Sequence, residues 1–200
     1  ARSISSFKDF RVKAASQLTG PEAGQLPEQE KTAFIARLHD AIYSAKICIY
    51  AQGFQLMKLA AKEHNWNLNF ASIAKIWRAG CIIRAVFLQP ITEAFERNED
   101  LENLLLDDFF AEQLNAHQGN WRKAVADATL LGIPVGALSS ALSYYDSMRA
   151  EVLPANLLQG QRDFFGAHTF ERVDKPAGKK YHVLWSSLER ETVEIPPVQK

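Results

Sequence analysis

An uninterrupted helical pattern between residues 32 and 65 limits the possible folds of this chain more than any other feature. Apolar residues recur there every three or four positions, and no proline interrupts them. This spacing is typical of an amphipathic helix, and Gly53 is the one residue within it that favours a break. The pattern therefore predicts one long helix, broken at Gly53 at most.

Helical patterns continue after this segment. Asn69 is suited to cap a helix that ends near residue 77, and Asp107 or Asp108 is suited to cap another that ends near residue 131. A helix over residues 82–96 is expected after a bend at Gly80, and Pro90 either kinks it or marks its start. A shorter helix is expected to end near residue 149.

Strand patterns are nearly absent before residue 181, and residues 193–200, with two prolines, are typical of an extended segment. The predicted fold class is therefore all-α. At the start of the chain, Ile4, Phe7, Phe10 and Ala14 also follow a helical spacing, with no capping residue before them. Residues 1–18 are expected to be the end of a helix that continues from upstream, and residues 19–29 a loop.

The composition is typical of a globular protein. Lysine plus arginine and aspartate plus glutamate number 23 each, so no overall charge favours nucleic acid or an anionic membrane as a partner. No apolar run is long enough to span a membrane. Cys48 and Cys81 are predicted to be buried free thiols of a reducing cytosol, with a disulfide as the alternative.

Arg162 and His168 are the best candidates for a binding site on chemical grounds. Pro154 suits the first turn of a helix and Gly166 suits the left-handed residue that ends one, which predicts a helix over residues 154–165. Arg162 would lie in its last turn and His168 just beyond it, where the two side chains could bind an anion or a hydroxyl. A purely structural role at the helix end is the alternative.

Five segments of the chain carry a resemblance to a known family. They are KICIYAQGFQLMKLAA, IAKIWRAGCIIRAVFL, NLLLDDFF, GIPVGALSSALSYYDSMRA and LPANLLQGQRDFFGAHTF, which begin at residues 46, 73, 103, 132 and 153. In this order they resemble the C-terminal part of 6-phosphogluconate dehydrogenase, and the similarity covers most of residues 2–182. That family oxidises and decarboxylates 6-phosphogluconate to ribulose 5-phosphate with NADP, in the pentose phosphate pathway.

The resemblance implies an all-helical domain over residues 1–182 that makes most of the contact in a homodimer. It also implies an extended tail over residues 183–200 that passes into the partner subunit, although the sequence diverges from the family after Lys180. The dinucleotide-binding domain is expected upstream of Ala1, because the chain contains no glycine fingerprint that opens a βα unit.

The resemblance also implies roles for three residues. Arg2 and Arg162 would bind the substrate phosphate, and His168 would hydrogen-bond the sugar-acid end or its hydroxyls. Arg162 and His168 would reach from one subunit into the active site of the other, so that the site is composite. The general base and acid are expected upstream, so no catalytic residue and no metal ligand is expected here, and cofactor-binding residues are unassigned.

Alternatives remain open at this point. The chain could be a non-catalytic helical interaction module that lacks the dehydrogenase half. NAD or a related phosphorylated sugar acid could also replace NADP and 6-phosphogluconate, because cofactor choice is made in the upstream half. The expected protein is a cytoplasmic enzyme for gluconate utilization, and these residues alone are expected to be inactive.

Overall fold

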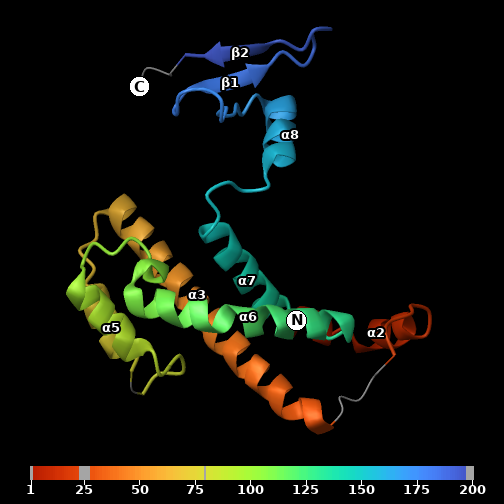
Figure 1. Ribbon diagram of the computed structural model, residues 1–200, viewed down its shortest axis with the longest axis vertical. Helices are drawn as coiled ribbons and strands as arrows, with labels where there is room; N and C mark the ends of the chain where they lie inside the picture. Colours follow the sequence, from red (N-terminus) through yellow and green to blue (C-terminus); the bar gives the residue numbers. More distant parts are fainter. Residues whose placement is uncertain (1, 23–27, 79, 197–200) are drawn as a thin grey trace. The chain divides into compact units, whose positions relative to one another are not determined.

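The structure is a computed structural model that describes residues 2–22, 28–78 and 80–196, apart from the side chain of Arg2 (Figure 1). The chain forms two compact units, Ala1–Met148 and Arg149–Lys200. These units do not test the predicted division into a helical domain over residues 1–182 and a tail over residues 183–200, which stays a prediction.

The described part of the first unit is helical. Its elements are α1 (Arg2–Ser5), α2 (Lys8–Ala15), α3 (Glu28–His64), α4 (Phe70–Ile76), α5 (Leu88–Arg97), the 3₁₀ helix η1 (Leu104–Leu106), α6 (Asp108–Leu130) and α7 (Gly136–Met148). The predicted long helix is confirmed as α3, which runs through Gly53 without a break. The mainly helical fold class is confirmed as well.

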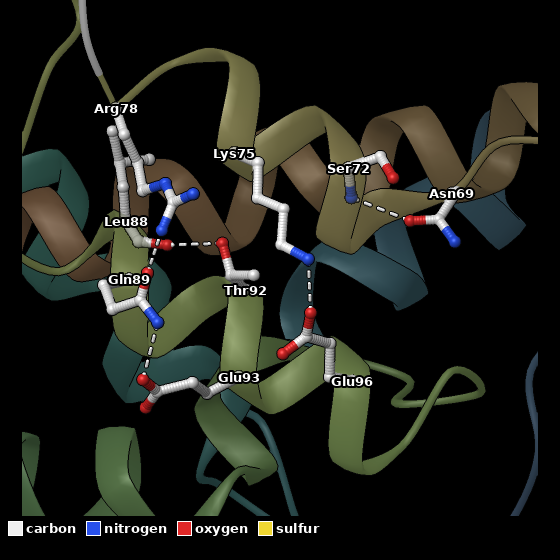
Figure 2. Close-up of polar contacts among 9 residues, drawn as sticks. All are labelled: Asn69, Ser72, Lys75, Arg78, Leu88, Gln89, Thr92, Glu93 and Glu96. Carbon is white, nitrogen blue, oxygen red and sulfur yellow. Dashed lines mark hydrogen bonds and ion pairs between the residues drawn. The ribbon is translucent and has the colours of Figure 1, made fainter.

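Side-chain caps explain where two of these helices begin. The Asn69 side chain accepts a hydrogen bond from the Ser72 N–H at 2.7 Å, which satisfies one of the unpaired donors in the first turn of α4 (Figure 2). Asp107, not Asp108, caps α6 by accepting a hydrogen bond from the Phe109 N–H at 3.2 Å. The caps predicted at Asn69 and Asp107 are therefore confirmed.

Other predicted boundaries are wrong. The helix expected from residue 82 begins only at Leu88, so that Pro90 lies in its first turn, where a missing N–H costs no helical hydrogen bond. The single helix expected over residues 1–18 is two short helices, α1 and α2, separated by a turn in which the Phe7 N–H bonds the Ile4 carbonyl at 3.1 Å. Of the predicted loop, residues 23–27 lie outside the described residues.

The core of the first unit lies where α3 packs against α6. Trp121 of α6 is fully buried there, and its indole N–H donates to the Leu138 carbonyl at 3.2 Å, which satisfies its polar atom. Cys48 of α3 is also fully buried, and burial raises the pKa of its thiol to about 12. Both Cys48 and the half-buried Cys81 are free thiols, so the alternative of a disulfide is wrong.

Helices α4 and α5 form a helical pair beside this core. Lys75 of α4 forms an ion pair with Glu96 of α5, and Arg78 donates a hydrogen bond to Gln89 (Figure 2). Within α5, the buried Thr92 hydroxyl donates to the Leu88 carbonyl at 3.0 Å, one turn earlier. Among the described residues, no helix combines the length and the apolarity that crossing a membrane requires.

The second unit consists of α8 (Asn156–Gly166) and a hairpin of two antiparallel strands, β1 (Lys180–Val183) and β2 (Thr192–Ile195). Tyr181 pairs with Glu194, and Val183 with Thr192. In the tail predicted over residues 183–200, Thr192–Ile195 are extended, but as a strand whose β-branched residues pair with β1, which the prediction did not include. Residues 197–200 of that tail lie outside the described residues.

Candidate functional site

The C-terminal end of α8 carries the candidate site. This helix begins at Asn156. Pro154, which was predicted to lie in its first turn, precedes it instead. The left-handed residue at its end is Ala167, with φ 47°, and not Gly166. The Ala167 N–H bonds the Asp163 carbonyl at 3.0 Å, and the His168 N–H lies 3.5 Å from the Arg162 carbonyl. These bonds close the last turn of the helix.

Gly166 has a different role from the predicted one. A β-carbon added to this residue would lie 2.8 Å from both Cδ2 and Nε2 of His168, well inside van der Waals contact. The ring of His168 therefore occupies the space that any other residue at position 166 would fill. Glycine leaves the room that lets the imidazole lie against the helix in its present place, while the backbone of Gly166 itself is helical.

A buried carboxylate, that of Asp163, lies at the centre of this unit. Its Oδ1 accepts hydrogen bonds from the Thr169 N–H at 3.1 Å and from the His182 imidazole at 2.8 Å. Its Oδ2 accepts from the Val183 N–H at 3.0 Å and from the Trp185 indole at 2.9 Å. A carboxylate has about four acceptor positions, so these four donors satisfy it completely.

The hydrogen bonds also set the charge state of Asp163. Burial by itself raises the pKa of this carboxyl. The hydrogen bonds from Val183, His182 and Trp185 outweigh burial, so that the pKa of Asp163 lies below its usual range. The group is therefore ionised at neutral pH and acts as an acceptor only.

Arg162 lies next to Asp163 in α8 and is exposed. It belongs to the turn before the last one, which corrects the predicted position, and its carbonyl takes part in the closing turn. Among the described residues, its guanidinium has no ion pair and no hydrogen bond. Five N–H donors are therefore available to an anion from solution.

His168 lines a groove of about 720 Å³ in the second unit. Two cations of the groove already have anionic partners, since Arg172 pairs with Asp174 and Lys180 with Glu171. The Arg172 hydrogen bond lowers the pKa of Asp174 to about 2, so this pair is charged at neutral pH. Arg162 is not among the residues that line the groove. The helix end thus brings Arg162 and His168 together through the backbone, but only His168 faces the groove.

The third predicted residue, Arg2, belongs to the first unit. Its backbone begins α1, and its side chain lies outside the described part of the structure. The predicted role of Arg2 therefore stays a prediction. No group of three or more histidine, cysteine, aspartate or glutamate side chains in the described residues is arranged to hold a metal ion.

Comparison with known proteins identifies the family. A sequence model described as "6-phosphogluconate dehydrogenase, C-terminal domain" matches residues 1–185. The chain belongs to this family. The decarboxylating 6-phosphogluconate dehydrogenase of Cunninghamella elegans is 53% identical over 93% of the chain, and that of Rattus norvegicus is 50% identical over the same share. The chain spans 38% of the length of each of these relatives.

A solved structure shows the same fold. The Plasmodium falciparum 6-phosphogluconate dehydrogenase, described in its apo form and in complex with NADP+ and with 6-phosphogluconate, superimposes with a TM-score of 0.82. It is 43% identical to this chain and covers 92% of it, while the chain covers 39% of that protein. The resemblance found in the sequence is therefore confirmed at the level of the family.

The structure of the present chain contains two clusters of polar side chains that the sequence did not predict. One is the Asp163 cluster, whose donors lie up to 22 residues further along the chain. The other lies in the first unit, where Asp40 meets His39 at 3.2 Å, His117 at 3.1 Å and the Asn120 amide at 2.7 Å. Burial raises the pKa of Asp40, and these hydrogen bonds outweigh it, so that the pKa is lowered. No local sequence pattern marks either cluster.

Proposed function

We propose that this chain is the substrate-binding and dimerisation part of an NADP-dependent enzyme that converts 6-phosphogluconate to ribulose 5-phosphate and CO2. The observation that carries the proposal is the end of α8, where the guanidinium of Arg162, which has no partner among the described residues, and the exposed imidazole of His168 adjoin the same turn. Membership of the family supplies the substrate class, because its Plasmodium falciparum member is described in complex with 6-phosphogluconate.

The chemistry of each residue suits one part of this substrate. Arg162 offers a planar fork of donors that can bind a phosphate through two parallel hydrogen bonds, and Arg2 would supply a second guanidinium. His168 would hydrogen-bond the sugar-acid end or a hydroxyl through an imidazole nitrogen. These residues bind and orient the substrate, while proton transfer at the reacting carbon belongs to residues outside this chain.

NADP, when bound, accepts the hydride from the substrate. The described strands form one antiparallel hairpin, which differs from the parallel βα unit whose glycine-rich turn holds a dinucleotide. The described residues thus do not fit the main cofactor site, and we assign none of them to NADP. A cytoplasmic location and gluconate utilization are part of the same proposal.

A homodimer with a composite site is also part of the proposal. Helix α3 exposes four large apolar side chains at seven-residue intervals, Ile35, Ile42, Ile49 and Leu56, each at least half exposed. A stripe of this spacing along one helix is typical of a face that packs against another protein surface. A second copy of this chain would cover it, and the same stripe favours the alternative of a non-catalytic interaction module.

The test uses a fusion of this chain to the remaining N-terminal part of the Cunninghamella elegans enzyme. We expect the fusion to reduce NADP with 6-phosphogluconate and the chain alone to show no turnover. The substitution Arg162→Ala removes a charged hydrogen-bond partner and is expected to raise KM for 6-phosphogluconate by on the order of tenfold or more. An inactive but dimeric fusion would favour the interaction module, and an unchanged KM in Arg162→Ala would remove Arg162 from the site.

A further inference from the structure

The Asp163 carboxylate holds both sides of the turn that carries His168. On one side it binds the Thr169 N–H, the residue directly after His168, at 3.1 Å. On the other it binds Val183 at 3.0 Å and Trp185 at 2.9 Å, at the end of β1 and just beyond it. Asp163 itself belongs to α8. One side chain therefore joins the helix, the turn and the hairpin.

The turn needs this support because its backbone is unusual. Ala167, with φ 47°, and Thr169, with φ 61°, flank His168, and both are left-handed without being glycine. For a β-branched residue such as threonine this conformation is rare and costly, so the surroundings must impose it. The Thr169 N–H is held by Asp163, and the Thr169 carbonyl accepts a hydrogen bond from Gln159.

Hydrophobic packing contributes little to this unit. Among its described residues only Asp163 and Tyr181 are buried, and most of the others are exposed. A satisfied buried carboxylate thus takes the place that an apolar core has in a larger domain. Loss of any of its four hydrogen bonds would leave a buried donor or acceptor unpaired.

His168 has no side-chain hydrogen bond among the described residues. Its ring lies nearly perpendicular to that of Phe165, with 5.8 Å between the centroids, and against Gly166. The direction of the imidazole is therefore set by the turn of residues 167–169 and by these two contacts on α8. Whatever fixes the turn also fixes the point from which the imidazole extends and the two contacts that orient it.

From this geometry we propose that Asp163 is a positioning residue, which holds His168 in the orientation needed to bind substrate. The inference rests on the proposed function of His168. The substitution Asp163→Asn tests it most directly, because the asparagine side chain has nearly the same size. Its NH2 group would face two of the four donors instead of accepting from them. Two of the four hydrogen bonds that Asp163 accepts would then be lost, while the rest of α8 keeps its sequence.

The experiment is a double-mutant cycle in the fused enzyme, with Asp163→Asn, His168→Ala and both together. His168→Ala is expected to raise KM for 6-phosphogluconate by about tenfold. Asp163→Asn is expected to raise KM by a similar factor with kcat within about twofold, since a lost binding contact affects KM first. The double variant is expected to match His168→Ala, because Asp163 acts through His168.

The two possible failures differ. An unchanged KM in His168→Ala would refute the proposed role of His168 itself. A raised KM in His168→Ala, together with an Asp163→Asn effect that is absent or multiplies with it, would overturn the positioning role and leave the proposed function intact. A purely structural role of Asp163 predicts this second result, because a general loosening does not depend on the imidazole.

Two further variants guard the test. Glu194→Gln removes the negative charge that pairs with Lys179 in the same hairpin without touching Asp163, so KM should stay within about twofold. A rise equal to that of Asp163→Asn would overturn the proposal. If Asp163→Asn does not fold, Trp185→Phe removes a single donor and should raise KM by a smaller factor that also disappears without His168. A multiplicative effect would overturn the proposal.

Discussion

The substitution Gly166→Ala should separate the placement of His168 from the stability of the fold. The backbone of Gly166 is helical and tolerates alanine, and the nearest atoms to the new methyl group belong to the imidazole, two of them at 2.8 Å. Optimal carbon contacts lie at 3.5–4.0 Å, and the ring must therefore retreat by roughly 0.7 Å or more. His168 can rotate away, because its side chain is exposed and no hydrogen bond from a described residue holds it in place.

This displacement gives a quantitative expectation. A misplacement approaching 1 Å can reduce the catalytic rate by up to about a hundredfold, and for a binding contact we expect kcat/KM for 6-phosphogluconate to fall by about tenfold. Alanine also stiffens the helix relative to glycine, so the free energy of unfolding should not fall by more than about 1 kcal/mol. Steady-state kinetics of the fused enzyme and urea denaturation of the chain measure the two quantities separately.

Gly119→Ala is the matched control. Gly119 lies within α6, and a β-carbon there would meet no atom within 4 Å. This change should raise the free energy of unfolding by roughly 0.5–1 kcal/mol and leave kcat/KM unaltered. A value of kcat/KM for Gly166→Ala within about twofold of the wild type would refute the reasoning, because the imidazole would then not need its present place.

Acid should weaken the second unit through Asp163. Because the native pKa lies below the ordinary value of 3.8, the ionised carboxylate stabilises the fold above that value, and this contribution is lost as the pH falls below it through the lower native pKa. Hydrogen exchange at the Val183 N–H should show this loss, and Asp163→Asn should remove the pH dependence. The apolar stripe on α3 should determine assembly. Ile49→Asp should convert the proposed dimer to monomers in light scattering, whereas Ile76→Asp, at a still more exposed position on α4, should not; a dimeric Ile49→Asp would place the interface elsewhere.

The sequence predicted helices well where a helix depends only on residues that are close together in the chain. The apolar period of α3 and the caps at Asn69 and Asp107 depend on neighbours within one turn or on one face of a helix. The start of α5 could not be found in this way, because residues 82–87 are rich in apolar side chains but form turns and loop. Their apolar pattern did not distinguish a helix from a loop in which Ile82 and Val86 are exposed.

The sequence offered candidate residues for the site but not the groups that support them. Arg162 and His168 could be named as candidates from chemistry and from the family resemblance, and their roles stay predictions, whereas Asp163 gave no signal. An aspartate in a helix is usually a solvated residue, and only the return of the hairpin buries it. Gly166 shows the same limit, because the motif suggested a left-handed glycine whereas the structure needs space for a ring two residues away.

The four hydrogen bonds of Asp163 also have a thermodynamic consequence. If the order of the hairpin favours the binding orientation of His168, then a ligand bound to His168 must favour the ordered hairpin by the same factor, since coupling between two sites is reciprocal. Substrate would thus stabilise β2, a strand that does not line the groove. Occupancy of the site would then be measurable in the hairpin, because the Asp163 carboxylate links the two.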